Sequence, residues 1–471
     1  MNQENETKLE RKLSPLNVWA LALGCIIGWG AFVMPANTFL PSGGPAGTAI
    51  AMGIAAVIMV LIAWNYSYMI VRYPIAGGEY AYISETFGKT HAFSASWLLG
   101  LCYLAIVPLN ATALALVGRN LLGGIFQVGF HYTVAGYDVY LGELLLALGA
   151  LVLFAYLSIR GVKFTGMFQT VLVFAIVAGV AAVALAALMM PSVTDGTLAP
   201  SFNPQTPVVP GIAAIVAVAP WAFVGFDTIP QAAEEYKFSP TKSKALMIIS
   251  IVFGAIIYVV LNTVTAAVVP DGYASWPEYI EAAGGLSGIE ALPTFHAAYA
   301  LLGPVGLTVL GIAVSAAIMS GIVGFYMATS RLLFAMGREN TLPSWFGKVD
   351  PKWKTPRNAI LFIMAVSLIA PFFGRTALGW LVDMSSVGAA VGYGYTSLAA
   401  WKIARQEGNT RIQITGILGA LMSLLFMVLL LVPLPGFSSS LGTESYICLI
   451  VWVILGIVFY LTSARKKTET E

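Results

Sequence analysis

The sequence predicts an all-α membrane protein with twelve transmembrane helices, and three observations support this fold class. First, 58% of the 471 residues are hydrophobic and only 10% are charged, against about a quarter charged in an average soluble domain. Second, the chain contains twelve apolar runs long enough to cross a bilayer as helices. Third, the positive charges fall on alternate segments between these runs, as in proteins that cross a membrane repeatedly.

The twelve runs divide the chain from end to end. They cover residues 16–40, 46–73, 92–120, 139–159, 164–190, 209–236, 245–269, 304–336, 358–373, 378–405, 412–432 and 446–463. Residues 1–15 and 464–471 are left as polar terminal tails. We therefore expect a multi-pass protein of a prokaryotic plasma membrane, in contact with the lipid bilayer over most of its length.

Lysine and arginine give a check on this division that does not use hydrophobicity. With the N-terminus in the cytoplasm, 22 of the 24 Lys and Arg residues fall on cytoplasmic segments, and only Arg119 and Arg375 fall outside. This asymmetry predicts that both termini are cytoplasmic. The outer loop at residues 271–302 has no Lys or Arg; it holds either a short helix over the outer mouth or a plain connection.

Two of the twelve runs, the first and the sixth, carry helix-breaking residues at mid-span. Those of the first run are Gly24, Gly28, Gly30 and Pro35. Those of the sixth run are Pro220, Gly225 and Pro230, with an acid, Asp227, between them. Simple kinks, or a packing face of small residues, are the alternative. Paired breaks at the start of two successive five-helix blocks are typical of a transporter with inverted repeats and a central binding site.

A broken helix at mid-bilayer leaves main-chain N–H and C=O groups without partners, at several kcal/mol for each group. A zwitterion satisfies both kinds of group. The N-terminus of a half-helix favours a carboxylate, and free carbonyls at a half-helix C-terminus favour an ammonium group or a coupling cation. The sequence therefore predicts a small zwitterionic substrate held between the two breaks.

Four motifs resemble those of the amino acid-polyamine-organocation (APC) superfamily of permeases, in the same order along the chain. They are GCIIGWGAF at 24–32, YPIAGGEY at 73–80 with ETFG at 85–88, GFD at 225–227, and SRLLFAMGR at 330–338. The resemblance implies the LeuT-type fold. Helices 1–5 (residues 16–190) and 6–10 (residues 209–405) would then be inverted repeats, and helices 11 and 12 (residues 411–463) would be peripheral.

The resemblance also implies which residues bind the substrate. In the family the carboxylate lies against the first break and the amino group lies near carbonyls of both breaks. The residues that correspond are Ile26, Ile27, Gly28, Trp29, Gly30, Trp221, Phe223, Gly225 and Phe226. An aromatic residue of the sixth helix often covers the family's site, so the lid here is Trp221 or Phe223. Trp29 departs from the small residue of many relatives and reduces the space for a ligand.

Four further polar residues are candidates from their positions alone. Asn110, in the third run, either contacts the substrate or makes a hydrogen bond between helices. Asp227 is expected as a proton carrier, a partner for a cationic substrate or a helix-end stabiliser, because ionisable residues within spans are usually functional. Asp383, in the tenth run, is a second coupling candidate unless it lies near the outer interface. Glu79 either joins an inner gate or is solvated.

Two acids near the cytoplasmic end of the sixth run, Glu234 and Glu235, are expected to pair with the adjacent Lys237. Some relatives carry a lysine in the fifth helix that replaces a sodium ion, but residues 164–190 contain no charged side chain. Sodium prefers oxygen ligands. The candidate sodium ligands are the hydroxyls of Ser315 and Ser320 and the carbonyls of Gly24 and Ile27, with plain helix packing as the alternative for the serines. Proton coupling through Asp227 or Asp383 is preferred by elimination.

These observations predict a secondary active transporter for amino acids or closely related amines, working by alternating access as a proton-coupled symporter or an exchanger. The alternatives are a polyamine or organic-amine permease, a sodium-coupled carrier and, in a different class, a channel. We expect no enzymatic activity, cofactor, bound metal or nucleic-acid partner, because the three His and three Cys residues have no catalytic or metal-binding spacing. The expected partners are a small-molecule substrate and a coupling proton or sodium ion.

Overall fold

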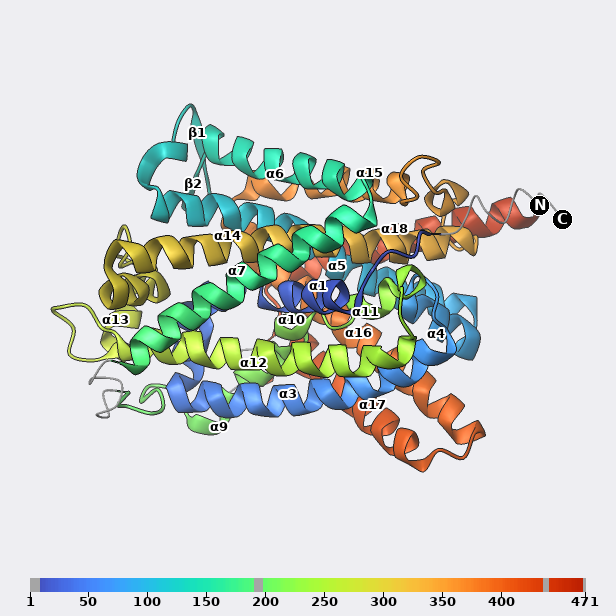
Figure 1. The fold of residues 1–471 in the computed structure, drawn as a ribbon, viewed down its shortest axis with the longest axis horizontal. Coiled ribbons are helices and arrows are strands. Elements are labelled where there is room, and N and C mark those ends of the chain that lie inside the picture. The colour runs from blue at the N-terminus through green and yellow to red at the C-terminus, as the bar shows by residue number, and fades with distance from the viewer. Residues whose placement is uncertain (1–8, 190–197, 435–439, 469–471) are drawn as a thin grey trace.

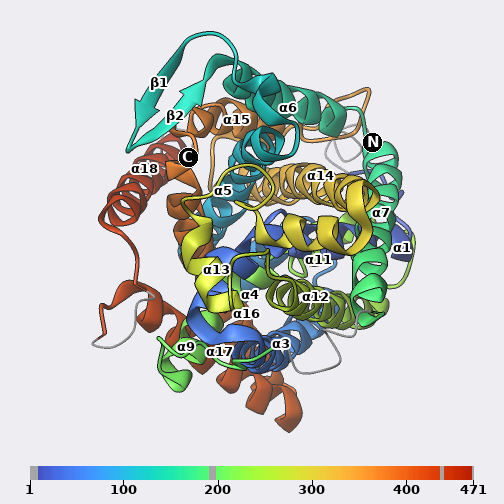
Figure 2. The same cartoon turned by 90° about the vertical axis from the view of Figure 1, so that its left-hand side faces the viewer.

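The computed structural model describes residues 9–189, 198–434 and 440–468. Long helices run side by side along one direction in Figure 1, and Figure 2 views the same bundle end-on. The predicted terminal tails, 1–15 and 464–471, lie partly outside the described residues. The elements as far as the second strand are α1 (Pro15–Ile27), α2 (Gly30–Met34), the π-helix η1 (Pro35–Phe39), α3 (Leu40–Arg72), α4 (Gly78–Phe87), α5 (Lys89–Leu121), η2 (Gly123–Phe126), β1 (His131–Val134) and β2 (Tyr137–Tyr140).

The remaining elements are helical. They are α6 (Leu141–Ile159), α7 (Val162–Leu188), α9 (Val208–Ala217), α10 (Ala219–Phe223), α11 (Thr228–Gln231), η3 (Ala233–Glu235), η4 (Pro240–Lys242), α12 (Ser243–Ala267), α13 (Trp276–Ala283), α14 (Pro293–Arg338), η5 (Ser344–Gly347), α15 (Arg357–Ser367), η6 (Ala370–Phe373), α16 (Thr376–Gln406), α17 (Thr410–Leu431) and α18 (Thr443–Thr468). Within the described residues, eight helical stretches are long and apolar enough to cross a membrane. That count takes Pro15–Arg72 as one stretch, so the twelve spans stay a prediction.

The expectation of an all-α fold is wrong at one place, because β1 and β2 form an antiparallel hairpin. The hairpin pairs Val134 with Tyr137 across a two-residue turn at Ala135 and Gly136, where both φ angles are positive. Such a turn matches the twist of antiparallel strands. Residues 139 and 140, predicted to begin the fourth helix, belong to this hairpin, and α6 begins only at Leu141.

Two other predicted helices differ at their ends. The eighth, predicted at 304–336, begins at Pro293 and bends at Gly303, where φ is 62°. The ninth is an eleven-residue α-helix, α15, followed by the short 3-10 helix η6. The loop predicted at 271–302 does contain a short helix, α13, which lies over one end of the bundle in Figure 2.

The predicted interruption of the first and the sixth run is confirmed. Helix α1 ends at Ile27, Gly28 adopts φ 39° and ψ −178°, and the helix resumes as α2 at Gly30. Helix α10 ends at Phe223 and α11 begins at Thr228, with Gly225 between them at φ 141°. The labels of α1, α10 and α11 fall at the centre of the bundle in Figure 1.

Lysine and arginine side chains of distant helices meet acids at one end of the bundle. We call the two ends of the bundle the α4 end and the α13 end, after the helices that lie there in Figure 1. At the α4 end the Arg72 Nε of α3 donates to Glu407 after α16 (2.9 Å), and the Lys89 Nζ of α5 donates to Glu339 after α14 (3.0 Å). These contacts gather residues that the sequence predicts on one side of the membrane.

Candidate functional site

The two breaks touch each other through Gly225. A β-carbon built on Gly225 would lie 2.6 Å from the main-chain nitrogen of Ile26 and 2.9 Å from the carbonyl oxygen of Ala22. Real β-carbons do not approach other atoms so closely. Glycine at 225 therefore lets the non-helical turn of the sixth run lie directly against the last turns of α1.

A small cavity lies where the breaks meet. Six of the residues predicted to bind substrate line it: Ile26, Gly28, Trp29, Gly30, Asn110 and Trp221. Six more lining residues were missed by the sequence analysis: Cys25, Ile106, Leu109, Val224, Tyr258 and Phe325. Its volume of about 20 Å³ has room for roughly one water molecule. A ligand larger than water therefore needs the surrounding side chains to move.

Trp221 closes the cavity over Gly30. The position of a β-carbon on Gly30 would lie 2.3 Å from the Trp221 ring, so the indole fills the space that a side chain there would take. Phe223, the other lid candidate, is fully buried beside Tyr258 and does not line the cavity. Of the two candidates, only Trp221 lines the cavity.

The remaining predicted binding residues lie behind the cavity. Ile27 and Phe226 are fully buried and do not line it. The Phe226 ring packs 5.5 Å from the ring of Tyr66 and 5.3 Å from that of Tyr393. Ile27 and Phe226 therefore pack behind the cavity and help to hold the breaks in position.

Unpaired polar groups remain among the lining residues. The Tyr258 hydroxyl donates to the Ile26 carbonyl (3.1 Å), and the Asn110 amide donates to the Ile106 carbonyl (2.9 Å). The Asn110 Oδ1 and the Trp29 Nε1 are buried without a hydrogen-bond partner in the described part of the chain. At the start of α2 the Phe32 N–H donates to the Trp29 carbonyl (3.0 Å), which leaves the N–H groups of Gly30 and Ala31 without partners within the helix. The site thus offers both acceptors and donors to a ligand.

Asp227 belongs to a second, buried polar cluster beside the break. Its Oδ1 accepts the N–H of Gly225 (2.8 Å), and its Oδ2 accepts the hydroxyl of Tyr103 (2.8 Å). The same hydroxyl lies 3.4 Å from the Glu79 Oε1, and the Gln231 amide donates to the other Glu79 oxygen. Glu79 and Asp227 are both fully buried, so the alternative of a solvated Glu79 is wrong.

Asp383 is not joined to the breaks. Its carboxylate accepts the hydroxyl of Ser445 (2.6 Å) and lies 3.5 Å from the N–H of Gly442. These contacts tie α16 to the segment that begins α18. The second coupling candidate therefore lies apart from the cluster that holds Asp227 and Glu79.

The candidate sodium ligands are only partly assembled. A β-carbon on Gly24 would lie 1.9 Å from the Ser320 Oγ, which is buried and has no hydrogen-bond partner among the described residues. The Ser320 carbonyl accepts the amide of Gln169 from α7 (2.9 Å). Ser315 is half-buried more than a turn before Ser320, and no contact of the described residues joins it to Gly24.

The α4 end is closed by two ion pairs that differ from the expected ones. Glu235 binds Arg331 (2.6 Å) in a pair that is almost wholly buried, and Glu234 binds Arg338 (3.1 Å). The predicted pairing with Lys237 is wrong, because α14 brings its arginines closer. Instead, the Lys237 N–H donates to the Leu13 carbonyl (2.9 Å).

The segment before α1 adds to this closure. The N–H groups of Lys12 and Leu13 both donate to the Glu235 carbonyl at 3.0 Å, and the Leu9 N–H donates to the Glu234 carboxylate (3.2 Å). Residues 9–13 therefore lie across the end of the sixth run.

A larger cavity of about 430 Å³ opens at the α13 end. It is lined by Phe32 and Val33 of α2 and by both arginines that the sequence places outside, Arg119 and Arg375. Arg119 binds Glu143 through two contacts of 2.5 Å, which neutralises one of these charges. Part of its wall is therefore α2, the half-helix that follows the first break.

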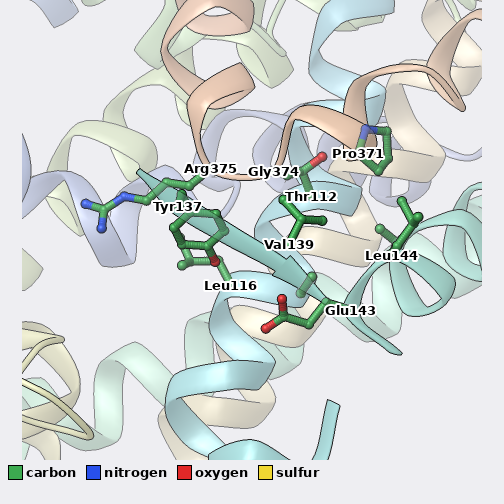
Figure 3. A pocket seen from close by; sticks show the side chains of 11 residues that line it. Thr112, Leu116, Tyr137, Val139, Glu143, Leu144, Pro371, Gly374 and Arg375 are labelled. Atoms are coloured by element: carbon green, nitrogen blue, oxygen red, sulfur yellow. The ribbon is translucent and has the colours of Figure 1, made fainter. Parts of the chain in front are cut away.

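Figure 3 shows the smaller pocket beside it, where β2 faces α5 and Arg375 extends away from Glu143. Burial raises the pKa of Tyr137 to about 12, despite the neighbouring guanidinium groups of Arg119 and Arg375. The hydroxyl of Tyr137 is therefore neutral at physiological pH.

One missed residue had a signal in the sequence. Tyr103 lies seven residues before Asn110, which is two helical turns and therefore the same helix face. A search of that face for polar residues finds both. Tyr258, Gln231 and Phe325 stand among apolar neighbours with no spacing that distinguishes them.

Known proteins that resemble this chain in sequence are transport proteins. Residues 13–459 match the family described as amino acid permease. The chain is 26% identical to a methylthioribose transporter of Bacillus subtilis, with 99% of this chain and 96% of that protein covered. It is 24% identical to the branched-chain amino acid permease BcaP of the same organism, with 98% and 95% covered. It is 26% identical to the vacuolar cationic amino acid transporter 4 of Arabidopsis thaliana, with 82% and 62% covered.

Proposed function

Because the chain belongs to the amino acid permease family, we propose that it is a secondary active transporter that moves a neutral amino acid across the membrane by alternating access. The observation that carries this proposal is the contact of two broken helices around a cavity with unpaired donors and acceptors. The free N–H groups of α2 would receive the carboxylate. The Asn110 Oδ1 would receive the ammonium group.

The proposed architecture is the LeuT-type fold with twelve spans. Elements α1 to α7 would form the first repeat, α9 to α16 the second, and α17 and α18 the periphery. Two supporting features are the equivalent position of the breaks in the two halves and the gathering of Lys and Arg at the α4 end. By the positive-inside rule we place the α4 end and both termini in the cytoplasm.

A neutral substrate is favoured over a cationic one by the lining of the cavity. Its side chains are mainly apolar and none is charged. Asp227, the expected partner for a cationic side chain, points instead to Tyr103 and Gly225. The relatives that transport branched-chain amino acids provide a precedent for an apolar side-chain pocket.

Access from outside is favoured in this conformation. The α4 end is sealed by the pairs Glu235–Arg331 and Glu234–Arg338, while the α13 end is hollowed. The cavity between the breaks is too small for an amino acid. Substrate entry would therefore require Trp221 to swing away from Gly30.

Coupling to protons through Asp227 is the proposal for the driving ion. Its carboxyl group accepts the Gly225 N–H within the break, so a change of its charge acts directly on the site. Sodium coupling at Ser320 has less support, because Gly24 is the one other candidate ligand that lies against the Ser320 hydroxyl among the contacts of the described residues.

Counterflow in proteoliposomes tests the proposed function. Vesicles loaded with one unlabelled amino acid at a time should take up the same labelled amino acid saturably for at least one neutral member of the panel. Gly30→Val should abolish this uptake by pushing against Trp221, whereas Gly149→Val, at an exposed helical position with open space, should retain it. No exchange with any amino acid or amine, or unsaturable ion current instead, would refute the proposal.

A further inference from the structure

We propose that Glu79 and Asp227 together form the binding site of the coupled proton, holding one proton between two carboxyl groups, and that the Tyr103 hydroxyl passes this proton from one to the other. The inference rests on the proposed function, since it names the ion and its site. The proposed ion is a proton, and binding of a metal cation instead is a result that the tests below can reveal.

The hydrogen bonds assign the proton to Glu79 in this structure. A tyrosine hydroxyl has one hydrogen and can give it to one acceptor. The Tyr103 hydroxyl lies 2.8 Å from the Asp227 Oδ2, and 3.4 Å from both the Glu79 Oε1 and the Asp227 carbonyl oxygen. Its hydrogen therefore goes to the Asp227 carboxylate, and a proton on Glu79 would turn the contact between Glu79 and the Tyr103 oxygen into a hydrogen bond.

The charges of the surroundings require the same assignment. Both carboxyl groups are fully buried, and in the described part of the chain neither forms an ion pair. The titratable groups that face them from the neighbouring helices are thiols and phenols, none of which can carry a positive charge: Cys25, Tyr66, Tyr82, Cys102, Tyr103 and Tyr393. Two adjacent buried carboxylates without a cation cannot both stay ionised. Asp227, which accepts two hydrogen bonds, keeps the negative charge.

A further buried polar group faces the Glu79 side of the cluster. The Tyr66 hydroxyl faces Glu79 and is buried without a hydrogen-bond partner of good geometry among the described residues. Unpartnered buried hydroxyls are costly unless another state of the molecule uses them. An ionised Glu79 would accept the Tyr66 hydroxyl in addition to the Gln231 amide. Hydrogen-bond donors therefore lie beside both carboxyl groups and can stabilise the negative charge on either one.

The transfer conserves atoms and charge. Tyr103 gives its hydroxyl hydrogen to the Asp227 Oδ2 as its oxygen takes the hydrogen of Glu79. Tyr103 stays neutral, Asp227 becomes a carboxylic acid and Glu79 becomes a carboxylate. The cluster holds one negative charge before and after the step.

The position of Asp227 couples this step to the substrate site. Its Oδ1 holds the N–H of Gly225, and Gly225 lies against the main chain of Ile26 in the first break. Protonation of Asp227 weakens its hold on that N–H, because a neutral carboxyl oxygen is a weaker acceptor than a carboxylate. Proton transfer therefore loosens the contact between the two breaks.

The first test measures the proton without transport. The infrared spectrum of the purified protein, recorded at each pH of a titration, should show the carbonyl band of a buried carboxylic acid in the wild type, and subtracting the Glu79→Gln spectrum at the same pH should assign this band to Glu79. Glu85→Gln, an exposed acid on the same helix, should leave the band unchanged. Absence of the band from the wild type throughout the titration would overturn the proposal, since both groups would then be ionised.

The second test separates coupling from transport. In proteoliposomes, Glu79→Gln and Asp227→Asn should lose uptake driven by a pH gradient by roughly tenfold or more, a usual size for coupling between two sites. Counterflow at equal pH should continue in at least one of them. Tyr103→Phe should shift the pH profile of driven uptake, while Tyr326→Phe, which removes a buried hydroxyl bound to the Leu151 carbonyl, should not.

The outcomes distinguish the two proposals. Wild-type protein that exchanges no amino acid refutes the proposed function. Wild-type protein that exchanges, with Glu79→Gln and Asp227→Asn still driven by a pH gradient, refutes the proton site alone. Uptake that requires sodium at every pH, and is lost in both variants, would assign the cluster to a metal cation and also overturn the proposal.

Discussion

At Gly225 a single missing side chain decides how closely the two broken helices approach. We expect Gly225→Ala to destabilise the protein by ~3 kcal/mol, because the new methyl group would overlap the Ile26 nitrogen and overpacking costs about 1–3 kcal/mol before the strain of a positive φ is added. Thermal unfolding in detergent measures the change. The control, Gly149→Ala, adds a methyl group in open space within a helix and should not lower the midpoint. Equal midpoints for both variants would show that the breaks do not touch.

Tyr258 supports the first break through its hydroxyl. Tyr258→Phe leaves the Ile26 carbonyl without its donor, at ~1–2 kcal/mol, and should weaken substrate binding by about fivefold to tenfold through a less ordered break. Scintillation binding assays measure the affinity. Tyr279→Phe, which removes a hydroxyl bound to the Glu290 carbonyl near the α13 end, should leave affinity unchanged. A loss in both variants, or in neither, would contradict this role.

Part of the candidate site could be predicted from the identity of single residues in the sequence. Glycine and proline spacing predicted the breaks at Gly28 and Gly225, because backbone breakers act locally and are visible in one dimension. The resemblance to the APC superfamily implied Gly30 and Trp221, and both line the cavity. Tyr258 and Gln231 were not predictable in this way. They meet the site only through the packing of α12 and α11, which depends on contacts between distant parts of the chain.

A buried ion pair joins two elements, the end of α14 and the end of the sixth run. Glu235→Gln leaves the Arg331 guanidinium buried without a counter-charge, which should cost ~3–5 kcal/mol. Thermal unfolding should therefore show a clear loss. The double variant Glu235→Gln with Arg331→Met should recover part of it, because a buried pair replaced by neutral groups is often nearly neutral in stability.

The matched control for this pair is an exposed one. Lys89→Gln breaks the half-exposed contact with Glu339, which should change stability by less than about 1 kcal/mol. A loss as large as that of Glu235→Gln would contradict the distinction between buried and exposed pairs.

The observed ends of the helices agree with the predicted ones where the length of an apolar run determines them. They differ where contacts between distant parts of the chain determine them. The short strands β1 and β2 escaped detection because they lie next to a long apolar run, and because only Gly136 of the two turn residues is typical of a tight turn. Helix α14 extends to Pro293 because Gly303 tolerates a bend that an apolar-run analysis takes as an end. The partners of Glu234 and Glu235 were mistaken because sequence proximity favoured Lys237 over arginines of α14.

Across the whole molecule, the asymmetry of Lys and Arg defines the proposed orientation. A single cysteine at position 352, near the α4 end, should react with a membrane-impermeant thiol reagent only after cells are permeabilised. A cysteine at position 290, near the α13 end, should react in intact cells. Both positions are exposed, and the native cysteines are buried or half-buried, which keeps the background low. The reverse pattern would invert the orientation, and labelling of both in intact cells would contradict the span count.

The central claim is that the substrate lies between the breaks of the first and sixth runs. The most direct measurement is an experimental density map of the protein with its transported amino acid. We predict density for the carboxylate at the N–H groups of Gly30 and its neighbours, density for the ammonium group near Asn110, and Trp221 displaced from Gly30. A continuous helix through residues 27–30, or a ligand bound elsewhere while this cavity stays closed, would contradict the account.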